Sequence, residues 1–356
     1  MTQSQSVNTQ FATNRQNAKN SLSQVELALG GTTSLIQDVQ TLTVNAGNGA
    51  LSQADRESIA AELQGRLDDL FGLGNSADGA GGYLFSGFRS TTLPFTKTST
   101  GAQYQGDQGQ RNLQIGSSRS VPISDSGSSV FENNITGNGT FETKADPANA
   151  GRGGSGIVST GAVTNTAALT GQSYAIKFNV VPGGATTYDV LNTTTGVPVS
   201  AGNAYASGQP IAFDGLTFDV KGVPADQDQF TVAPSVNQSL FQTVTDLITT
   251  LRSPSNGAAG QAALTNGLNK AHENLNSSLD NVLSVRASIG SRLKEIDNLD
   301  SAGDDLNIQY STTLSQLQDL DTVKAISLFT QQQFTLEAAQ KSFKTLSGLS
   351  LFNFIN

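Results

Sequence analysis

Apolar side chains recur alternately four and three positions apart near the start of the chain, which is the spacing of a heptad-like helical seam. The seam consists of Ala18, Leu22, Val25, Leu29, Thr32, Ile36, Val39, Thr43 and Ala46. This pattern predicts one long helix over residues 4–46. Gly47, Asn48 and Gly49 follow it, and their composition is typical of a helix end.

A second helix is predicted directly after this glycine-rich turn. Ser52 followed three residues later by Asp55 resembles a capping signal, in which each side chain bonds to the other's backbone. One face of the segment then carries Ala60, Leu63, Leu67 and Leu70. The short connection implies that this helix returns antiparallel to the first.

The middle of the chain has the alternation of apolar and polar residues that is typical of β-strands. Residues 95–131 show it in short runs separated by turn residues, and residues 135–235 form a distinct block of the same kind. The clearest alternating positions in the block are Tyr174, Ile176, Phe178 and Val180, Leu216, Phe218 and Val220, and Phe230 with Val232. We expect the block to be a small β-rich domain inserted into a helical chain.

Helical spacing returns after this block. A short seam (Leu240, Val244, Leu247 and Leu251) precedes a turn or loop over residues 253–260, and a much longer seam then runs from Leu264 to Leu299 and includes Arg292. Two helical ends flanking a β insertion predict an α+β fold, a helical-bundle rod with an inserted domain. The predicted divisions are 1–134, 135–235, 236–318 and 319–356.

The C-terminal segment carries a long apolar stripe close to helical spacing. Its residues are Phe329, Leu336, Ala339, Phe343 and Leu346, followed by Leu349, Leu351, Phe352, Phe354 and Ile355. The stripe is too short and too rich in Gln, Lys and Ser to span a bilayer. An exposed apolar stripe invites association, so we interpret it as an assembly surface for partner helices in the same molecule or in neighbouring ones.

Composition narrows the possible functions. The net charge of −9 and the pI near 4.6 argue against nucleic-acid binding, which needs clustered Lys and Arg. The absence of Cys excludes disulfides and thiolate metal sites. The first residues lack the pattern of a secretory signal peptide, and no stretch approaches eighteen consecutive apolar residues, so no membrane span is expected.

Candidate chemistry is sparse. Residues 72–77 match a dinucleotide-binding glycine pattern, but they end a helix where that pattern should open one. His272 is the only imidazole and has no second His or Cys to share a metal. Asp226, Asp228 and Asp125 are possible calcium ligands or acid–base residues, yet their neighbours are ordinary turn residues. We therefore expect neither catalysis nor a cofactor or metal.

Several stretches resemble the bacterial hook-filament junction family, the hook-associated protein 3 relatives of flagellin. The most specific are residues 12–29, GGYLFSGFRSTTLPF at 81–95, YQGDQGQRNLQIGSSRSVPISDSG at 104–127 and the block at 317–356. Residues 222–232 are similar to a G-x-P-A-x-G-D-x-F-x-V stretch of axial flagellar proteins. The resemblance covers nearly the whole chain and is weakest in the insert.

The chain departs from the family pattern in three places. Family members normally begin with a further helical segment that pairs with the C-terminal helix, and this chain is expected to start after it. Gln227 stands where the family usually has Gly, so we expect the turn there to differ slightly. Asp319-Leu320-Asp321 is followed by Thr322 and Val323, where the family usually has Tyr-Ala.

The resemblance implies a structural adaptor in a ring that joins the flagellar hook to the filament. The implied partners are neighbouring copies, the adjacent hook-associated protein, flagellin and a cytoplasmic export chaperone at the C-terminal helix. The implied location is the extracellular flagellum, reached through the flagellar type III apparatus. Two alternatives are a flagellin-type filament subunit and, more distantly, a secreted glycan-binding protein, which the scarcity of aromatics and the absence of Trp disfavour.

Overall fold

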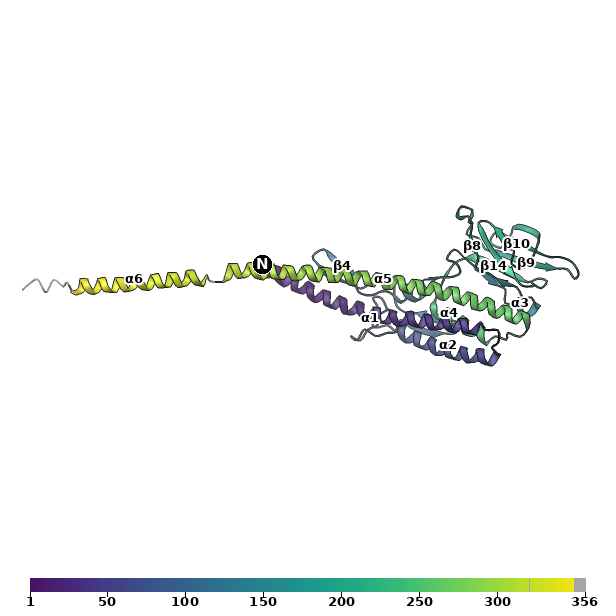
Figure 1. Ribbon diagram of the computed structural model, residues 1–356, viewed down its shortest axis with the longest axis horizontal. Helices are drawn as coiled ribbons and strands as arrows, with labels where there is room; N and C mark the ends of the chain where they lie inside the picture. Colours follow the sequence, from purple (N-terminus) through teal and green to yellow (C-terminus); the bar gives the residue numbers. More distant parts are fainter. Residues whose placement is uncertain (320, 349–356) are drawn as a thin grey trace, which may run out of the picture. The chain divides into compact units, whose positions relative to one another are not determined.

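The computed structural model describes residues 1–319 and 321–348 (Figure 1). The chain divides into two units: Asn14–Asp297, and Met1–Thr13 together with the described part of Asn298–Asn356. Its helices are α1 (Thr2–Ala46), α2 (Gln53–Gly74), α3 (Asn149–Arg152), α4 (Leu240–Arg252), α5 (Gly257–Gln318) and α6 (Thr322–Gly348). The long N-terminal and C-terminal helices and the β-rich middle confirm the predicted α+β class.

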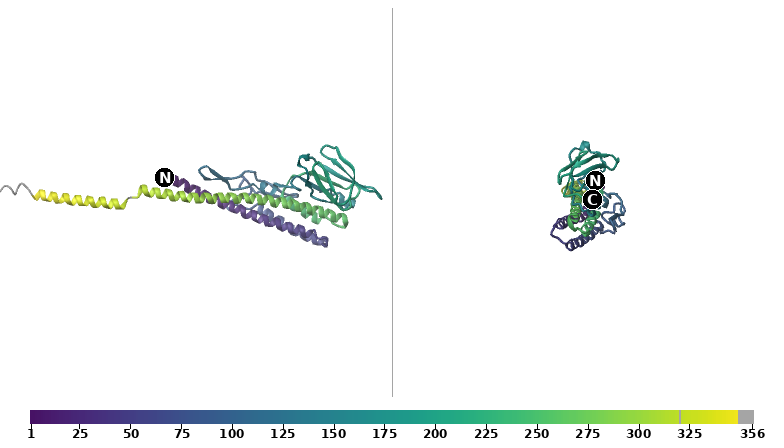
Figure 2. Two further views of the ribbon diagram at one scale, coloured as in Figure 1. Left: turned by 45° about the horizontal axis from the view of Figure 1, so that its top comes forward. Right: turned by 90° about the vertical axis from the view of Figure 1, so that its right-hand side faces the viewer.

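In the larger unit, α1 and α5 run side by side (Figure 2). The predicted seams are buried, with Leu22, Leu29 and Ile36 of α1 and Leu275, Val282 and Ile289 of α5 among the core residues. Polar contacts border this core. Arg286 Nη2 of α5 donates to Glu26 Oε1 of α1 at 2.6 Å, and Lys19 Nζ lies 2.6 Å from Asp297 Oδ1.

The second helix begins as its sequence predicts. Ser52 and Asp55 form a full capping box: Asp55 N donates to Ser52 Oγ at 3.2 Å, and Ser52 N donates to Asp55 Oδ2 at 2.9 Å. The buried face of α2 meets α1 closely at Gly31, where a Cβ atom would lie 2.9 Å from Leu73 Cδ2. A glycine inside a long helix is explained there by the close approach of α2.

Two hairpins and a π-helical turn follow α2. They are β1 (Phe95–Thr98) with β2 (Gly101–Tyr104), β3 (Asn112–Gly116) with β4 (Arg119–Pro122), and η1 (Ser128–Glu132). Aromatic side chains of this region pack against those of the helices. Phe241 of α4 lies 4.6 Å from Phe71 and 4.8 Å from Phe95, measured between ring centroids.

The block between β5 and β15 contains two main sheets. One has the order β11-β10-β9-β14-β6, and the other has the order β12-β13-β7 with β8 paired to β13. The bounds are β5 Asn134–Ile135, β6 Phe141–Ala145, β7 Ile157–Val158, β8 Ala162–Val163, β9 Tyr174–Val180, β10 Thr186–Asn192, β11 Pro198–Ala204, β12 Pro210–Phe213, β13 Leu216–Lys221, β14 Gln229–Pro234 and β15 Asn237–Gln238, with a 3-10 turn η2 at Thr166–Ala168. The predicted inward residues of β13 are buried, as are Tyr174, Ile176 and Phe178 of β9. Val180 is only half-buried, and Ala175 is buried although it lies on the other face of β9.

In the smaller unit, the first residues of α1 bond to the last third of α5. Asn8 is buried and its Nδ2 donates to the Gly303 carbonyl at 2.7 Å. One local prediction is wrong: α5 begins at Gly257, so the loop predicted to reach residue 260 is shorter. Ala258 and Ala259 account for this, because alanine has the highest helix propensity. In the described residues, no helix is both long and apolar enough to cross a membrane.

Candidate functional site

The C-terminal helix presents the predicted stripe as an exposed apolar face. Phe329, Leu336 and Phe343 recur every seven residues and are 60%, 59% and 74% exposed. Leu346, 71% exposed, and Ala339 lie on the same side of α6. Leu349, Leu351, Phe352, Phe354 and Ile355 lie outside the described residues. Four large apolar side chains on one helix face are thus exposed among the residues that the structure describes.

A second apolar face of α6 was missed from the sequence. Phe334 is 74% exposed and, at 3.6 residues per turn, lies about 140° around the helix from Phe329. Val323, 77% exposed, also lies well away from the stripe. The signal was present in the sequence, because Phe334 is five residues from Phe329 and therefore cannot share its face. Apolar side chains are therefore exposed in two well-separated directions around α6.

The start of α6 is fixed by an aspartate of the Asp319–Asp321 motif. Lys324 N donates to Asp321 Oδ1 at 3.0 Å, and Ala325 N donates to the Asp321 carbonyl at 2.8 Å. The Asp321 carboxylate therefore satisfies the Lys324 N–H group, which has no partner inside the helix, and the Asp321 carbonyl accepts the first intrahelical bond. A carboxylate is also favoured at the positive end of the helix dipole.

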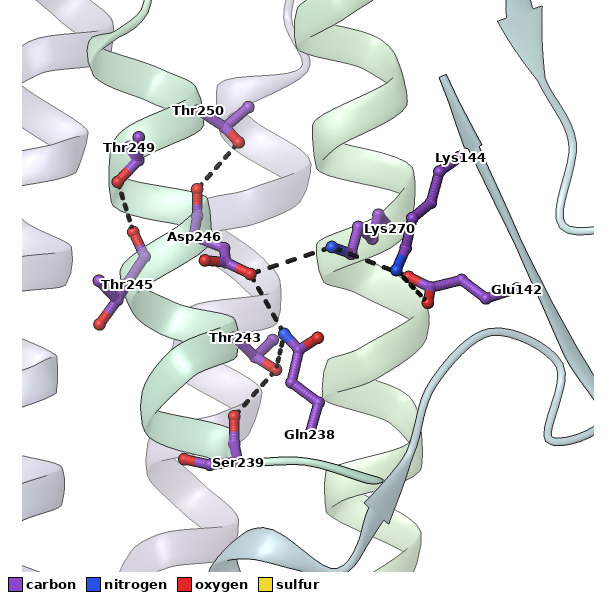
Figure 3. Close-up of polar contacts among 10 residues, drawn as sticks. All are labelled: Glu142, Lys144, Gln238, Ser239, Thr243, Thr245, Asp246, Thr249, Thr250 and Lys270. Atoms are coloured by element: carbon purple, nitrogen blue, oxygen red, sulfur yellow. Dashed lines mark hydrogen bonds and ion pairs between the residues drawn. The ribbon is translucent and has the colours of Figure 1, made fainter. Parts of the chain in front are cut away.

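A polar cluster joins the β domain, here residues 135–235, to α4 and α5 (Figure 3). Lys270 of α5 lies between two carboxylates, with its Nζ 3.8 Å from Glu142 Oε1 and 4.0 Å from Asp246 Oδ2. Glu142 is almost fully buried and also pairs with Lys144 at 2.7 Å. Gln238 Nε2 donates to Asp246 Oδ2 at 3.3 Å. Burial raises the pKa of the Asp246 carboxyl, and the charge of Lys270 opposes that shift.

Two further residues of α5 contact the β domain. Asn266 Nδ2 donates to the Gly156 carbonyl at 3.0 Å, and its Oδ1 accepts from Val158 N at 3.0 Å. The side-chain amide thereby bonds the backbone of β7 and of the residue before it, much as a neighbouring strand would. Glu273 accepts a hydrogen bond from the Thr160 hydroxyl. Burial raises the pKa of Glu273, and this hydrogen bond opposes the shift.

The aspartates considered for chemistry make structural hydrogen bonds. His272 is exposed on α5. Asp226 Oδ1 accepts from Val180 N at 3.0 Å, which holds the pKa of its carboxyl below the usual range. Asp228 is buried and accepts from Ala225 N at 2.8 Å, and burial raises its pKa. Residues 72–77 end α2, as predicted.

Asp125 has a partner that sequence patterns did not reveal. Arg292 of α5 donates from Nη1 to Asp125 Oδ2 at 2.8 Å and from Nη2 to Oδ1 at 3.0 Å. Gln110 Nε2 donates to the same carboxylate at 2.9 Å. The pair fastens the segment after β4 to α5.

Long terminal helices, a β-rich insertion and an exposed apolar C-terminal helix define a flagellin-like axial protein. The family model for the bacterial flagellin N-terminal helical region matches residues 1–90. Flagellar hook-associated protein 3 from Salmonella typhimurium is 28% identical over 352 residues, covering 99% of this chain and 83% of the relative. The protein of the same name from Escherichia coli is 27% identical over 353 residues, with the same coverage.

Two solved structures show more specifically which flagellar proteins this chain is similar to. The flagellar hook associated protein-3 from Legionella pneumophila superposes with a TM-score of 0.83 at 30% identity, covering 90% of this chain and 98% of that one. FlgL from Xanthomonas campestris gives a TM-score of 0.81 at 30% identity, covering 89% and 100%. The chain belongs to the flagellar hook-associated protein 3 (FlgL) family.

Proposed function

We propose that this protein is the structural adaptor that joins the hook to the filament in the bacterial flagellum, without catalysis. The observation that carries the proposal is the exposed apolar helix α6 in a chain of this family. Burial of one large apolar side chain contributes roughly 1.5–3 kcal/mol. Several such residues on α6 are therefore sufficient to hold subunits together without covalent links.

The proposed joining surface is the stripe predicted from the sequence. It consists of Phe329, Leu336, Ala339, Phe343 and Leu346, continued by Leu349, Leu351, Phe352, Phe354 and Ile355. Its proposed partners are neighbouring copies of the chain, the adjacent hook-associated protein and flagellin. In this scheme residues 1–134 and 236–318 form the rod, 135–235 form the inserted β domain, and 319–356 form the assembly segment.

The same stripe is proposed to act before assembly. Export through the flagellar type III apparatus requires that subunits do not polymerise in the cytoplasm. A cytoplasmic chaperone that covers the stripe prevents this, because it occupies the polymer contact. The stripe is then buried by neighbouring subunits after export, so one surface serves both partners in turn.

Electron microscopy of a strain lacking the gene tests the proposal. An adaptor's loss leaves hooks without filaments and releases flagellin into the medium, and expression of the intact protein restores filaments. A flagellin-type filament subunit behaves differently, because its loss removes the filament protein itself from the medium. Filaments of normal length in the deletion strain would rule out both functions.

A further inference from the structure

The β domain packs its apolar side chains against one another. Its main hydrophobic cluster contains Phe141, Val158, Tyr174, Ile176, Phe178, Val190, Ile211, Leu216, Phe218, Val220, Phe230 and Val232. Within the described residues, every member of this cluster comes from strands of the β domain. The domain therefore completes its apolar core by itself, as an independently packed module does.

Contact with the helices is made by polar groups instead. Asn266, Lys270 and Glu273 are spaced four and three residues apart, which places them on one face of α5. Asn266 bonds the backbone around β7. Lys270 pairs with Glu142, and Glu273 accepts a hydrogen bond from Thr160. We call these three side chains the polar latch.

A cleft of about 830 Å³ lies beside the polar latch and separates the β domain from the helices. Thr143 and Asn149 line it from the β domain, and Thr250, Asn266 and Lys270 line it from α4 and α5. Apolar side chains also line it, Ala145 and Val158 from the β domain and Ala262 and Leu264 from α5, but they face open space of a size that admits water. The two surfaces therefore touch through the polar latch without a close-packed apolar interface.

A narrow neck connects the β domain to the rod. Strands β5 and β15 are two residues long and pair antiparallel, with Ile135 opposite Asn237. The rod end of the neck is anchored, because Asn281 Nδ2 of α5 donates to Asn134 Oδ1 at 3.1 Å. Beyond this anchor, Ile135 and Val236 are 44% and 57% exposed, so the neck is not enclosed by the rod.

We propose that the β domain is a hinged module, held against α5 by the polar latch and free to turn about the neck when the polar latch opens. Lys270 is 32% exposed, so its attraction to Glu142, its partner in the β domain, is partly screened by dissolved salt. Raising the ionic strength therefore shifts the population from the docked to the released arrangement. Removing the polar latch has the same effect at low salt.

The absence of Cys from the chain allows a direct distance measurement. Spin labels are placed at the exposed positions A185C in the β domain and S58C in α2, and distances are measured by double electron–electron resonance. At low salt the intact chain is expected to give one dominant distance. N266A/K270M is expected to raise the released fraction at least about tenfold, and K294M, which removes an exposed lysine of the same helix, is expected to leave it unchanged.

High salt is expected to move the intact chain toward the distribution of the double variant. Circular dichroism and amide protection of β9 and β14 establish that the domain stays folded. If N266A/K270M misfolds, N266A alone and the salt titration of the intact chain replace it. Distances that stay the same in the folded variant and at every salt concentration would overturn the hinge.

Discussion

Arg292 and Asp125 form a buried, two-point ion pair between α5 and the segment that follows β4. The two hydrogen bonds measure 2.8 and 3.0 Å, and the side chains are only 14% and 6% exposed. Two parallel hydrogen bonds fix the orientation of the guanidinium relative to the carboxylate as well as the distance between them. It therefore sets where the segment that leads to η1 sits against the long helix.

Removal of one member of this pair is expected to destabilise the protein strongly. Asp125→Ala leaves the Arg292 guanidinium buried without its carboxylate, which costs about 3 kcal/mol or more. Arg292→Lys keeps the charge but loses the two-point geometry, so an intermediate loss is expected. Urea denaturation measures both changes. The matched control is Lys97→Met, whose pair with Asp68 is more than half exposed and is worth under about 1 kcal/mol.

The turn at residues 226–228 retains a conformation that suits glycine. Gln227 has φ +69°, in the left-handed region where a Cβ atom costs roughly 1–2 kcal/mol. Gln227→Gly relieves this strain but increases the entropy of the unfolded chain. A net stabilisation of up to about 1 kcal/mol is expected in thermal unfolding. Gln229→Gly in β14 should destabilise instead, and a loss of stability in Gln227→Gly would show that the turn is unstrained.

The helices were predictable because their burial follows a local repeat. Leu22, Leu29 and Ile36 lie in a seam that needs no knowledge of distant residues, and the Ser52–Asp55 cap is also local. Arg292 shows the limit of this reasoning. Its spacing placed it correctly on the inward face of α5, but its partner is 167 residues away, and a single sequence does not reveal such pairs.

The candidate site was predicted only in part for a similar reason. Heptad spacing identified Phe329, Leu336 and Phe343, but a search for one stripe passed over Phe334 on another side of α6. The polar latch was also missed. Asn266 and Lys270 have the composition of an ordinary solvated helix face, and only their position beside β7 and Glu142 distinguishes them.

The rod is expected to fold without the β domain. Just beyond the neck strands, Thr136 N donates to the Val236 carbonyl at 2.9 Å. The two chain segments are therefore close enough for a short Gly/Ser linker to replace residues 138–234. A helical circular-dichroism spectrum and cooperative melting are expected to remain. Replacing residues 113–121 is the contrasting change, because it removes the bond from Arg15 to the Ile115 carbonyl and should lower the melting temperature. Loss of helix in the first variant would mean that the β domain supports the rod.

Docking of the β domain is expected to tighten as the pH falls from about 7 toward about 5. Burial raises the pKa of Glu273, so the docked state binds a proton more readily than a released state with Glu273 in water. Thr160 and His272 oppose the shift, Glu142 adds to it, and Lys270 lies one turn away. The docked fraction therefore decreases as the pH rises through the raised pKa.

The Glu273→Gln variant separates this effect from other titrations. Gln keeps a hydrogen-bond acceptor for the Thr160 hydroxyl but does not titrate, so the pH response of the spin-label distance is expected to shrink. The pKa of Asp246 is also raised by burial, but Asp246 belongs to α4 and stays in the rod when the β domain is released. A response of full size in Glu273→Gln would assign the effect to other groups.

The final prediction concerns the shared use of the α6 stripe. Leu336→Ala/Phe343→Ala removes two exposed apolar side chains from one face, each worth roughly 1.5–3 kcal/mol when buried by a partner. Binding to the export chaperone is expected to weaken at least about a hundredfold by calorimetry, and junction assembly is expected to fail in the same variant. Phe334→Ala is the matched control, because it removes a similar area from a different side of α6.

The chaperone affinity and the assembly of the junction test different parts of the proposal that one surface serves both partners. Unchanged chaperone affinity with lost assembly would show that the chaperone and the neighbouring subunits use separate surfaces. Full motility of the double variant would show that this face is not the joining surface. If Phe334→Ala impairs assembly while chaperone binding persists, the second side of α6 is covered by a subunit and not by the chaperone.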